Sequence, residues 1–341
     1  MTGALTWARV SYRQQRWELL LVAIGVAGAA AAMLWFASTL DGMRAASPEC
    51  LGAVTGDPRV SVSATTACQA TLESYSRAQE WASNLVNLAW AAPFGIGVIL
   101  GAPLVAREID GGTAQLAWSL SRSRVGWLLR RIGFVALFGL LVLGILAITS
   151  ELLTAALLPD RTLGEDFAYF GRRGLPVVAR GAGAIMLGVL VGSITGRVLP
   201  AILASALIIA LVFAGLSLAQ DRWNQGEASM ERFYDGSGNP VAFDLAALDV
   251  SYGLETVDGE FLSYGEAFER GMATTIVDER GRVYDSDASY EAGQPVGYDV
   301  RLAIPGERYP ELMLRDSAIG VILGLVALAA AAFVVVRRRP A

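Results

Sequence analysis

The sequence predicts an all-α polytopic membrane protein with six transmembrane helices and one small α+β domain outside the membrane. Hydrophobic residues make up 54% of the 341 residues and charged residues only 17%, against roughly 25% charged residues in soluble domains. Five stretches are clearly apolar over about 20 residues, the length that a helix needs to cross a hydrocarbon core, and a sixth is shorter. A long polar stretch, residues 221–316, precedes the last of them.

The apolar stretches define the spans, which we expect at residues 19–40, 85–106, 127–158, 174–196, 198–220 and 317–336. The fourth reaches full length only if the helix continues past Arg180. The first is too long for a signal peptide and has no convincing cleavage site after it, so a retained helix is expected. Residues 1–18 combine aromatic residues with three arginines, which is typical of a helix lying in the membrane interface. A plain basic flank fits these residues equally well.

Arginine placement predicts the side on which each loop lies, because short cytoplasmic loops carry an excess of basic residues. Arginines gather before the first span, in residues 107–131 and in the tail 337–341. We therefore expect both termini in the cytoplasm of a multi-pass plasma-membrane protein. The opposite side then receives three segments, residues 41–84, 159–173 and 221–316. The last of these carries 20 acidic residues against 8 arginines.

Composition also excludes several classes of active site. All 27 basic residues are arginines, and the sequence has no lysine and no histidine. A standard P-loop needs a phosphate-binding lysine, and zinc hydrolases and Ser-His-Asp triads need histidine. We therefore expect no catalytic residue, metal site or ATPase site in this chain, and no nucleic-acid partner. If the protein uses ATP, the ATPase is another chain.

Cys50 and Cys68 are the two cysteines of the chain, and both fall in the predicted outer loop 41–84. Two cysteines in one extracytoplasmic loop favour a disulfide in an oxidising compartment. Two unpaired thiols are the alternative.

Residues 221–316 are long enough to bury a small core, so we expect a compact extracytoplasmic α+β domain between the fifth and sixth spans. Residues Thr275–Val277 and Val283–Tyr284, on either side of a turn at Gly281, are typical of a β-hairpin. The stretch YGEAFERG, from Tyr264 to Gly271, predicts a short helix.

Glu151 and Arg180 are ionisable residues close to the ends of spans. Charges inside a membrane are costly and are often functional, so a Glu151–Arg180 pair lining a transport pathway is one interpretation. The other, which we favour, places both at the outer interface, because both lie near the same predicted membrane boundary.

The stretch VAREIDGGTAQLAWSLSRSR, residues 105–124, is long and charged for a turn between two spans. Gly111 and Gly112 permit a sharp change of backbone direction. Beyond them the residues predict a helix, which Thr113 can cap. On that helix, Leu116 and Leu120 share one face. Glu108 and Asp110 are expected in first turns, where carboxylates favour a helix N-terminus. An ordinary basic loop is the alternative.

In this segment the chain resembles the ABC-2 type permease family, the membrane subunits of type V ABC transporters. The residues that match the family's pattern are Arg107, Glu108, Gly112, Thr113, Leu116, Ser121–Arg122, Trp127 and Arg130–Arg131. Two further segments, Tyr12–Arg16 and the final span with its arginines, are similar to the actinobacterial branch of the family.

The resemblance implies that residues 107–124 form a cytoplasmic coupling helix that docks on a separate ABC ATPase. The residues expected to make this contact are Arg107, Glu108, Asp110, Gly112, Thr113, Leu116, Leu120 and Arg122. The partner would bind ATP and Mg²⁺, and this chain would bind no cofactor. A second permease, identical or different, would face this one in the bilayer. Glycines such as Gly97 would then allow close helix approach along the substrate path.

The function expected from this resemblance is that of a permease subunit of an exporter. A secondary transporter would need ion-coupling residues inside the membrane, for which Glu151 and Arg180 are the candidates. A membrane-anchored sensor or assembly factor would use residues 221–316 as its binding module, but it would leave the charged segment 107–124 unexplained.

Overall fold

The computed structural model describes residues 2–51, 66–120, 123–235, 239, 241, 243–270, 276–278, 280–284, 286–293 and 295–338. The chain divides into two compact units. Unit 1 comprises Met1–Arg161, Tyr169–Val212 and Glu311–Ala341, and unit 2 comprises Thr162–Ala168 and Phe213–Pro310. The second unit therefore includes a piece of the predicted connection 159–173 in addition to most of the predicted domain 221–316.

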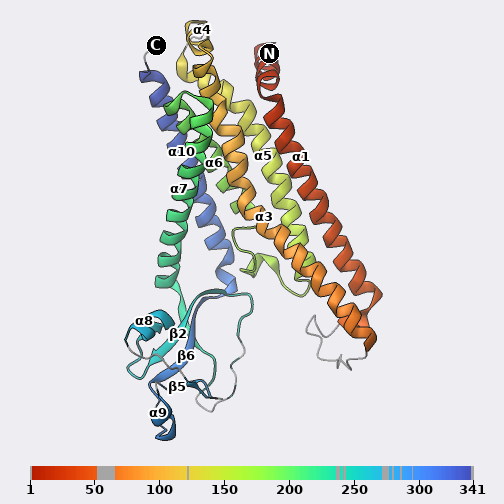
Figure 1. Ribbon diagram of the computed structural model, residues 1–341, viewed down its shortest axis with the longest axis vertical. Coiled ribbons are helices and arrows are strands. Elements are labelled where there is room, and N and C mark those ends of the chain that lie inside the picture. Colours follow the sequence, from red (N-terminus) through yellow and green to blue (C-terminus); the bar gives the residue numbers. More distant parts are fainter. Residues whose placement is uncertain are drawn as a thin grey trace. The chain divides into compact units, whose positions relative to one another are not determined.

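Unit 1 is a helix bundle. Its helices are α1 (Thr2–Ala46), α2 (Pro48–Leu51), α3 (Thr66–Asp110), α4 (Thr113–Leu120), α5 (Arg124–Leu157) and α6 (Leu175–Thr195), with parts of α7 (Val198–Glu227) and α10 (Tyr309–Arg337). In the described part of the chain, six helices are long and apolar enough to cross a membrane, which confirms the predicted number of spans. The start of α1, the end of α10 and α4 lie at one end of the bundle, here called the α4 end (Figure 1).

Several helices extend beyond the predicted spans. α1 begins at Thr2, and its backbone leaves helical geometry at Gln15 (φ −119°, ψ 18°), where the spanning part begins. This kink lies inside the segment 1–18 that was expected in the membrane interface. α3 is a single helix of 45 residues. Its first turns take in the end of the predicted outer loop, because residues 69–82 are rich in good helix formers such as Ala, Leu, Glu and Gln.

Glycines bring α3 and α6 into backbone contact. A Cβ atom at Gly101 of α3 would lie 2.3 Å from the carbonyl oxygen of Ile185 in α6. A Cβ atom at Gly192 of α6 would lie 2.3 Å from the carbonyl oxygen of Ala102 in α3. Small residues at such positions let membrane helices pack at close range. The two helices therefore meet without side chains between them.

α10 approaches α6 in the same way. A Cβ atom at Gly320 would lie 2.9 Å from the carbonyl carbon of Ala179, and one at Gly324 would lie 3.4 Å from the Cα atom of Gly183. α6 is consequently the most enclosed spanning helix, with 67% of its apolar part buried compared with 17% for α7. The bundle has α6 at its centre, between α3 and α10.

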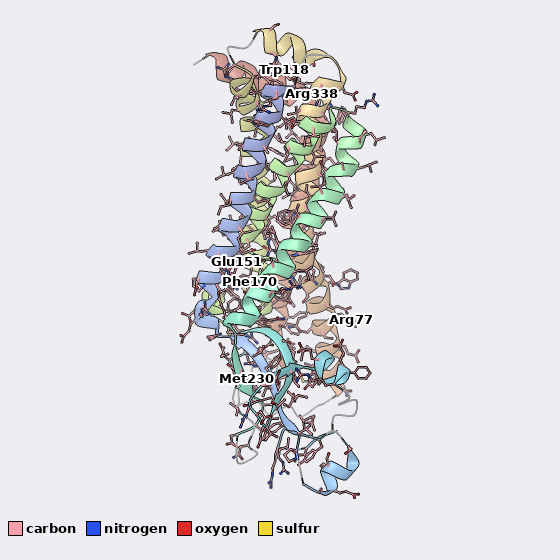
Figure 2. All side chains as sticks on the ribbon, turned by 90° about the vertical axis from the view of Figure 1, so that its left-hand side faces the viewer. Arg77, Trp118, Glu151, Phe170, Met230 and Arg338 are labelled. Atoms are coloured by element: carbon pink, nitrogen blue, oxygen red, sulfur yellow. A yellow bond between two sulfur atoms is a disulfide. The ribbon has the colours of Figure 1, made fainter. Side chains whose placement is uncertain are left out.

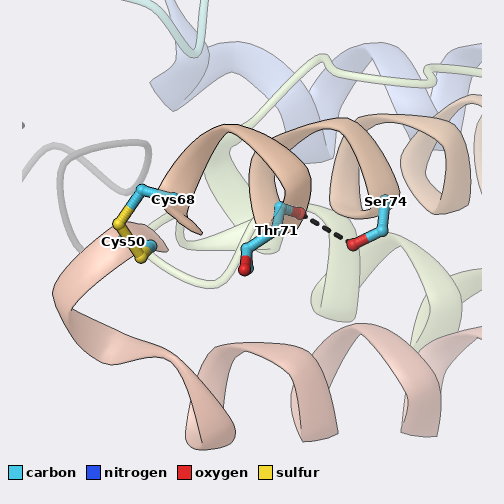
Figure 3. Close-up of a disulfide and its surroundings, with 4 residues drawn as sticks. All are labelled: Cys50, Cys68, Thr71 and Ser74. Carbon is cyan, nitrogen blue, oxygen red and sulfur yellow. Dashed lines mark hydrogen bonds between the residues drawn. A yellow bond between two sulfur atoms is a disulfide. The ribbon is translucent and has the colours of Figure 1, made fainter. Parts of the chain in front are cut away.

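Cys50 and Cys68 form the predicted disulfide, with their Cα atoms 5.2 Å apart. The bond joins α2 to the first turn of α3 (Figure 3). Further along α3, the hydroxyl of Ser74 donates a hydrogen bond to the carbonyl oxygen of Thr71. The disulfide closes the connection between the first two spanning helices at the end of the bundle away from α4.

Unit 2 contains a six-stranded sheet in which every pairing is antiparallel. Its strands are β1 (Ser229–Arg232), β2 (Leu248–Thr256), β3 (Phe261–Ser263), β4 (Ile276–Val277), β5 (Arg282–Tyr284) and β6 (Gly297–Ile304). β6 is central: β2 pairs along one edge, and β1 and β5 pair with successive parts of the other. The unit also contains two short α-helices, α8 (Tyr264–Glu269) and α9 (Asp287–Glu291), and the 3₁₀ helices Leu163–Glu165 and Gly306–Arg308.

The two local predictions for unit 2 are confirmed. β4 and β5 form the hairpin, and Gly281 at its turn has a φ of +69°. Thr275, which was included in the first strand, lies outside the described residues. The predicted short helix is α8, whose N-terminus carries a capping box between Ser263 and Glu266. A small core of Leu254, Leu262, Ala267 and Val283 packs beneath these elements.

Candidate functional site

The segment between the second and third spanning helices folds as a short helix between two turns. α3 ends at Asp110, a turn follows at Gly111 and Gly112, and α4 runs from Thr113 to Leu120. Gly112 has a φ of +68°, in the left-handed region that costs a residue with a Cβ atom about 1–2 kcal/mol. The predicted change of direction at the glycines and the predicted helix after them are both confirmed.

The prediction that Glu108 and Asp110 open a following helix is wrong, because both lie in the last turn of α3. The helix does not end where the apolar run ends at Ala106; it ends where Gly112 turns the backbone. Asp110 nevertheless meets a helix N-terminus, since its carboxylate accepts a hydrogen bond of 3.3 Å from the backbone N–H of Val198, the first residue of α7. Carboxylates are favourable at this position.

Glu108 and Arg131 form a buried ion pair between α3 and α5. The carboxylate and guanidinium groups are 2.7 Å apart, and the residues are 7% and 2% exposed. Glu108, which was expected to contact the ATPase, is paired here with Arg131 of the same chain. The neighbouring Arg107 forms an ion pair with Glu18 of α1. The end of α3 is thus joined by charge to both α1 and α5.

α4 packs on the start of α5 through aromatic and cationic side chains. The rings of Trp118 and Trp127 meet edge to face with centroids 6.0 Å apart, and Trp127 is buried. The guanidinium of Arg124 lies 4.8 Å from the centre of the Trp118 ring, within the range of a cation–π contact. Thr113, at the other end of α4, donates a hydrogen bond to the carbonyl oxygen of Glu108. Both ends of α4 are therefore held by neighbouring residues.

Arginines satisfy the free carbonyl groups at the ends of two other helices. Arg124 donates hydrogen bonds to the carbonyl oxygens of Val336 (3.0 Å) and Arg338 (2.8 Å) at the end of α10. Arg338 in turn donates to the carbonyl oxygen of Ser193 in the last turn of α6. Cationic groups at helix C-termini satisfy carbonyls that have no partner within the helix. Trp118 and Arg338 mark this end of the bundle in Figure 2.

Leu116 and Leu120 lie in α4. The side chains of Leu116 and Leu120 and the whole of Arg122 lie outside the described residues. Gly112 and Thr113 lie at the start of α4 as described above, and Arg107, Glu108 and Asp110 lie in α3.

The sequence analysis assigned no separate role to Arg124, in the segment 105–124, or to Arg338, in the tail 337–341. Arginines in these segments were interpreted as indicators of orientation. A signal for Arg124 was present, because Ser123 before it is a good N-cap residue, and its side chain does accept a hydrogen bond from the N–H of Gly126. This cap fixes Arg124 as the first residue of α5. Its partners on α10 are more than 200 residues away, beyond any local pattern.

Glu151 and Arg180 do not pair with each other. Glu151 forms an ion pair of 2.7 Å with Arg173, and Arg180 forms one of 3.1 Å with Asp316 of α10. Arg180 also donates to the carbonyl oxygen of Gly171. The proposed Glu151–Arg180 pair is therefore wrong, because the chain before α6 brings Arg173 to Glu151. These contacts lie toward the end of the bundle away from α4, where Figure 2 shows Glu151.

Gly97, predicted to ease contact between two permeases, is buried inside this chain instead. A Cβ atom at Gly97 would lie 2.5 Å from the Cβ atom of Ala184 in α6. The residue serves the packing of α3 on α6, because its absent side chain leaves room for Ala184. Gly97 therefore does not line an open path within this chain.

Charged pairs also organise the sheet of unit 2. Arg301 of β6 contacts Glu231 and Asp249, each at 2.8 Å. Asp299, in the same strand, accepts a hydrogen bond from the hydroxyl of Tyr264. Burial raises the pKa of the Asp299 carboxyl above its usual value, because the charged form loses solvation. Among the described residues, no group of three or more His, Cys, Asp or Glu side chains could hold a metal ion.

The chain also matches a known protein family. The model of a family described as "ABC-2 membrane transporter related" matches residues 21–220, more than half of the chain. The matched region begins in α1, ends in α7 and includes α4 with all its described contacts. Searches of curated proteins and of solved structures returned no match.

Proposed function

Because the chain belongs to the ABC-2 membrane transporter related family, we propose that it is the transmembrane permease subunit of an ATP-driven exporter. In this proposal a separate cytoplasmic ATPase binds ATP and Mg²⁺, and α4 is the element on which the ATPase docks. The chain is a multi-pass membrane protein of the family. Its partner, its direction of transport and its orientation are part of the proposal.

The single observation that carries the docking role is the construction of α4. It is a helix of eight residues, set off from α3 by a glycine turn and held at both ends. Arg124, which stacks on it, also reaches α10, and Asp110, just before it, reaches α7. A force applied to α4 would therefore reach several spanning helices at once. A loop that served only to connect two spans would not require such contacts.

The arginines of the α4 end support the proposed orientation. Arg13, Arg16, Arg130 and Arg197 are exposed there or beside it, and basic residues favour the cytoplasmic side. With α4 in the cytoplasm, both termini are cytoplasmic and the disulfide lies outside, where oxidising conditions favour it. Two permease copies, identical or different, would enclose the transported molecule between them in the bilayer.

The ion pairs at the other end favour this proposal over a secondary transporter. An ion-coupled transporter needs a charged group that can bind and release a coupling ion. Glu151 is engaged by Arg173, and Arg180 by Asp316. A sensor that used unit 2 as its binding module would give no reason for the contacts of α4.

The test is co-purification of the full chain with an ABC ATPase from its own host, followed by ATPase assays in lipid nanodiscs. The proposal expects a stable complex whose ATPase activity rises when the transported molecule is added. A matched pair of variants at α4 sharpens the test. Replacing Ser119, an exposed residue of α4, by Arg should weaken the complex. Replacing Asp160, an exposed residue just after α5, by Arg should not weaken it. A native chain that binds no ATPase would overturn the proposal.

A further inference from the structure

A short segment ahead of α6 grips α3 at the end of the bundle away from α4. Residues 169–174, here called the strap, directly precede α6 and belong to unit 1. The hydroxyls of Tyr169 and of Ser83 in α3 form a hydrogen bond of 2.8 Å. Arg172 donates a hydrogen bond of 2.7 Å to the side-chain oxygen of Asn87, one turn further along α3. The strap therefore holds α3 at two successive turns.

The strap is held more firmly on its other side. Arg173, which is 1% exposed, forms its ion pair of 2.7 Å with Glu151 of α5. The carbonyl oxygen of Gly171 accepts a hydrogen bond from Arg180 of α6, and a Cβ atom at Gly171 would lie 2.7 Å from that guanidinium. Both partners of the arginine–asparagine bond to α3, by contrast, are exposed, so water can replace that bond at little net cost. If the strap and α3 separate, the strap stays with α5 and α6.

The backbone of the strap is strained at the residue that contacts α3. Among the described non-glycine residues, Tyr169 alone has a positive φ, of 56°, in a region that is unfavourable for a residue with a Cβ atom. Such a conformation persists only where surrounding contacts hold it. The hydroxyl bond to Ser83 is one of these contacts. The strap is therefore shaped for the position that α3 has in this structure.

α3 contains a weak point between the part that the strap holds and the part that α6 holds. Gly97 and Gly101 fix the second part, since added Cβ atoms there would lie 2.5 Å and 2.3 Å from atoms of α6. Pro93 lies between Asn87 and these glycines. Its ring removes the backbone hydrogen bond to the carbonyl four residues earlier, and proline is a common cause of helix bends. Residues 66–92, here called the arm, can therefore bend relative to the rest of α3.

The arm buries few large side chains. Between the disulfide and Pro93, its buried residues are Tyr75, Ala78, Ala82, Val86 and Ala89. Because the free energy gained by burial scales with apolar area, a face made largely of alanine separates at lower cost than a face of leucines. The Cys50–Cys68 disulfide ties the tip of the arm to α2, so the adjoining end of α1 moves with the arm.

We propose that the strap is a latch on the arm of α3. When its bonds to Ser83 and Asn87 open, the arm bends away from the bundle at Pro93, while Gly97 and Gly101 keep the rest of α3 on α6. The inference rests on the proposed function for the purpose of this motion, which is to open the extracytoplasmic end of the exporter for release of the transported molecule. The latch itself is a property of this chain.

Spin labels on the full chain, in lipid nanodiscs without an ATPase, measure the motion directly. The labels are attached to Ser76→Cys on the arm and Ile148→Cys on α5, both at exposed positions. The native cysteines are bonded to each other and do not react. A bend of about 20°, the lower limit of a sharp proline kink, would move residue 76, about 25 Å along the helix from Pro93, by about 9 Å. Double electron–electron resonance resolves such a shift.

Opening the latch should add a second distance to the single main distance of the native chain. Ser83→Ala combined with Asn87→Ala should produce a population that is longer by up to about 9 Å. Loss of each hydrogen bond should raise the ratio of this population to the native one by about 2- to 12-fold. Tyr169→Phe removes the hydroxyl bond from the strap side and should produce a smaller share of the same population. The control is Arg77→Gln, at an exposed arm residue that bonds only within α3, and it should keep the native distance.

The two prolines of α3 distinguish a hinge from a general loosening of the chain. In the Ser83→Ala and Asn87→Ala background, Pro93→Ala should restore the missing backbone bond and reduce the longer-distance population by at least about half. Pro103→Ala, on the far side of the glycine contacts, should leave that population unchanged. Partial unfolding would not distinguish the two prolines.

Two results would overturn the latch. One is a native distance distribution in both the Ser83→Ala and Asn87→Ala chain and the Tyr169→Phe chain. The other is a longer-distance population that Pro93→Ala does not reduce. Because no ATPase is present, either result counts against the latch and not against the proposed function. A chain that shows the latch but binds no ATPase would contradict the proposed function alone.

Discussion

The carboxylate of Glu108 lies 2.7 Å from the guanidinium of Arg131, and both side chains are buried between α3 and α5. The pair fixes the end of the helix that leads into α4 to the start of the helix that leaves it. Glu108 Oε2 and Arg131 Nη1 make no hydrogen bond with the described residues. Loss of either residue would therefore leave the other as a buried charge with no hydrogen-bond partner for these atoms among the described residues.

Replacement of Glu108 by Arg should destabilise the bundle strongly. It would place two guanidinium groups in one buried site, and removal of one partner from a buried pair costs about 3–5 kcal/mol. The midpoint of thermal unfolding in detergent should fall, and the exchanged pair Glu108→Arg with Arg131→Glu should recover part of the loss. Arg130→Glu, a charge reversal at an exposed neighbour, is the control. A Glu108→Arg variant as stable as the native chain would show that the pair contributes nothing.

Gly101 and Gly95 lie on the same helix and make a matched pair for the contact between α3 and α6. A Cβ atom at Gly101 would lie 2.3 Å from a backbone oxygen, whereas one at Gly95 meets nothing within 4 Å. Gly101→Ala should therefore cost about 1–3 kcal/mol through overpacking, and Gly95→Ala should cost nothing. Equal unfolding midpoints for the two variants would contradict the backbone contact.

Loss of the disulfide should lower the stability of the bundle at the end away from α4. Cys50 and Cys68 are 18 residues apart, and closing a loop of this size contributes about 3 kcal/mol in the chain-entropy description. Cys50→Ser should unfold at a lower temperature, and reduction of the native protein should have the same effect. Mass spectrometry of unreduced peptides should show the two cysteines linked; alkylation of both in the untreated protein would disprove the bond.

Asp299→Asn should stabilise unit 2 at neutral pH. Burial raises the folded-state pKa of Asp299 above its unfolded value of 3.8, so the folded state holds the proton more tightly. The contribution of the native Asp299 to the free energy of unfolding is fully present below the unfolded-state pKa. It is lost as the pH rises through the folded-state pKa. The protection of β6 against hydrogen exchange, compared between variant and native at the same pH, should show a gain that disappears toward acid.

Glu255→Gln is the matched opposite case. A hydrogen bond from Arg232 lowers the pKa of the Glu255 carboxyl, so this contribution is present above the unfolded pKa and is lost as the pH falls through the folded pKa. The variant should therefore lose β6 protection at neutral pH and match the native chain in acid. The same sign for both variants would contradict these two assignments.

The sequence predicted the parts of the fold that depend on one-dimensional patterns. Apolar runs located the spans, the stretch from Tyr264 to Gly271 located α8, and Gly281 located the hairpin turn. Hydropathy did not predict where α3 ends, because the end is fixed by the conformation of Gly112, which lies beyond the end of the apolar run at Ala106. This is why Glu108 and Asp110 were assigned to the wrong helix.

Partners across the bundle were beyond prediction for a different reason. Glu151 and Arg180 are at similar predicted depths, which made them plausible partners. Depth does not fix rotation about a helix axis, however, and the structure pairs each with another residue. Gly97 was interpreted correctly as a site of close helix approach, but the sequence could not show that the approaching helix is α6 of the same chain.

The glycine contacts of α6 determine where a solute could cross the bundle. At Gly101 and Gly192, a single added carbon atom would lie 2.3 Å from a carbonyl oxygen of the facing helix. Because the backbones of α3 and α6 touch along this seam, a change of side-chain rotamer cannot open a gap between them. A conduit along that seam would require the two backbones to separate by the full breadth of the passing molecule. In the proposed permease, a route for the transported molecule would therefore have to run along another face of the bundle.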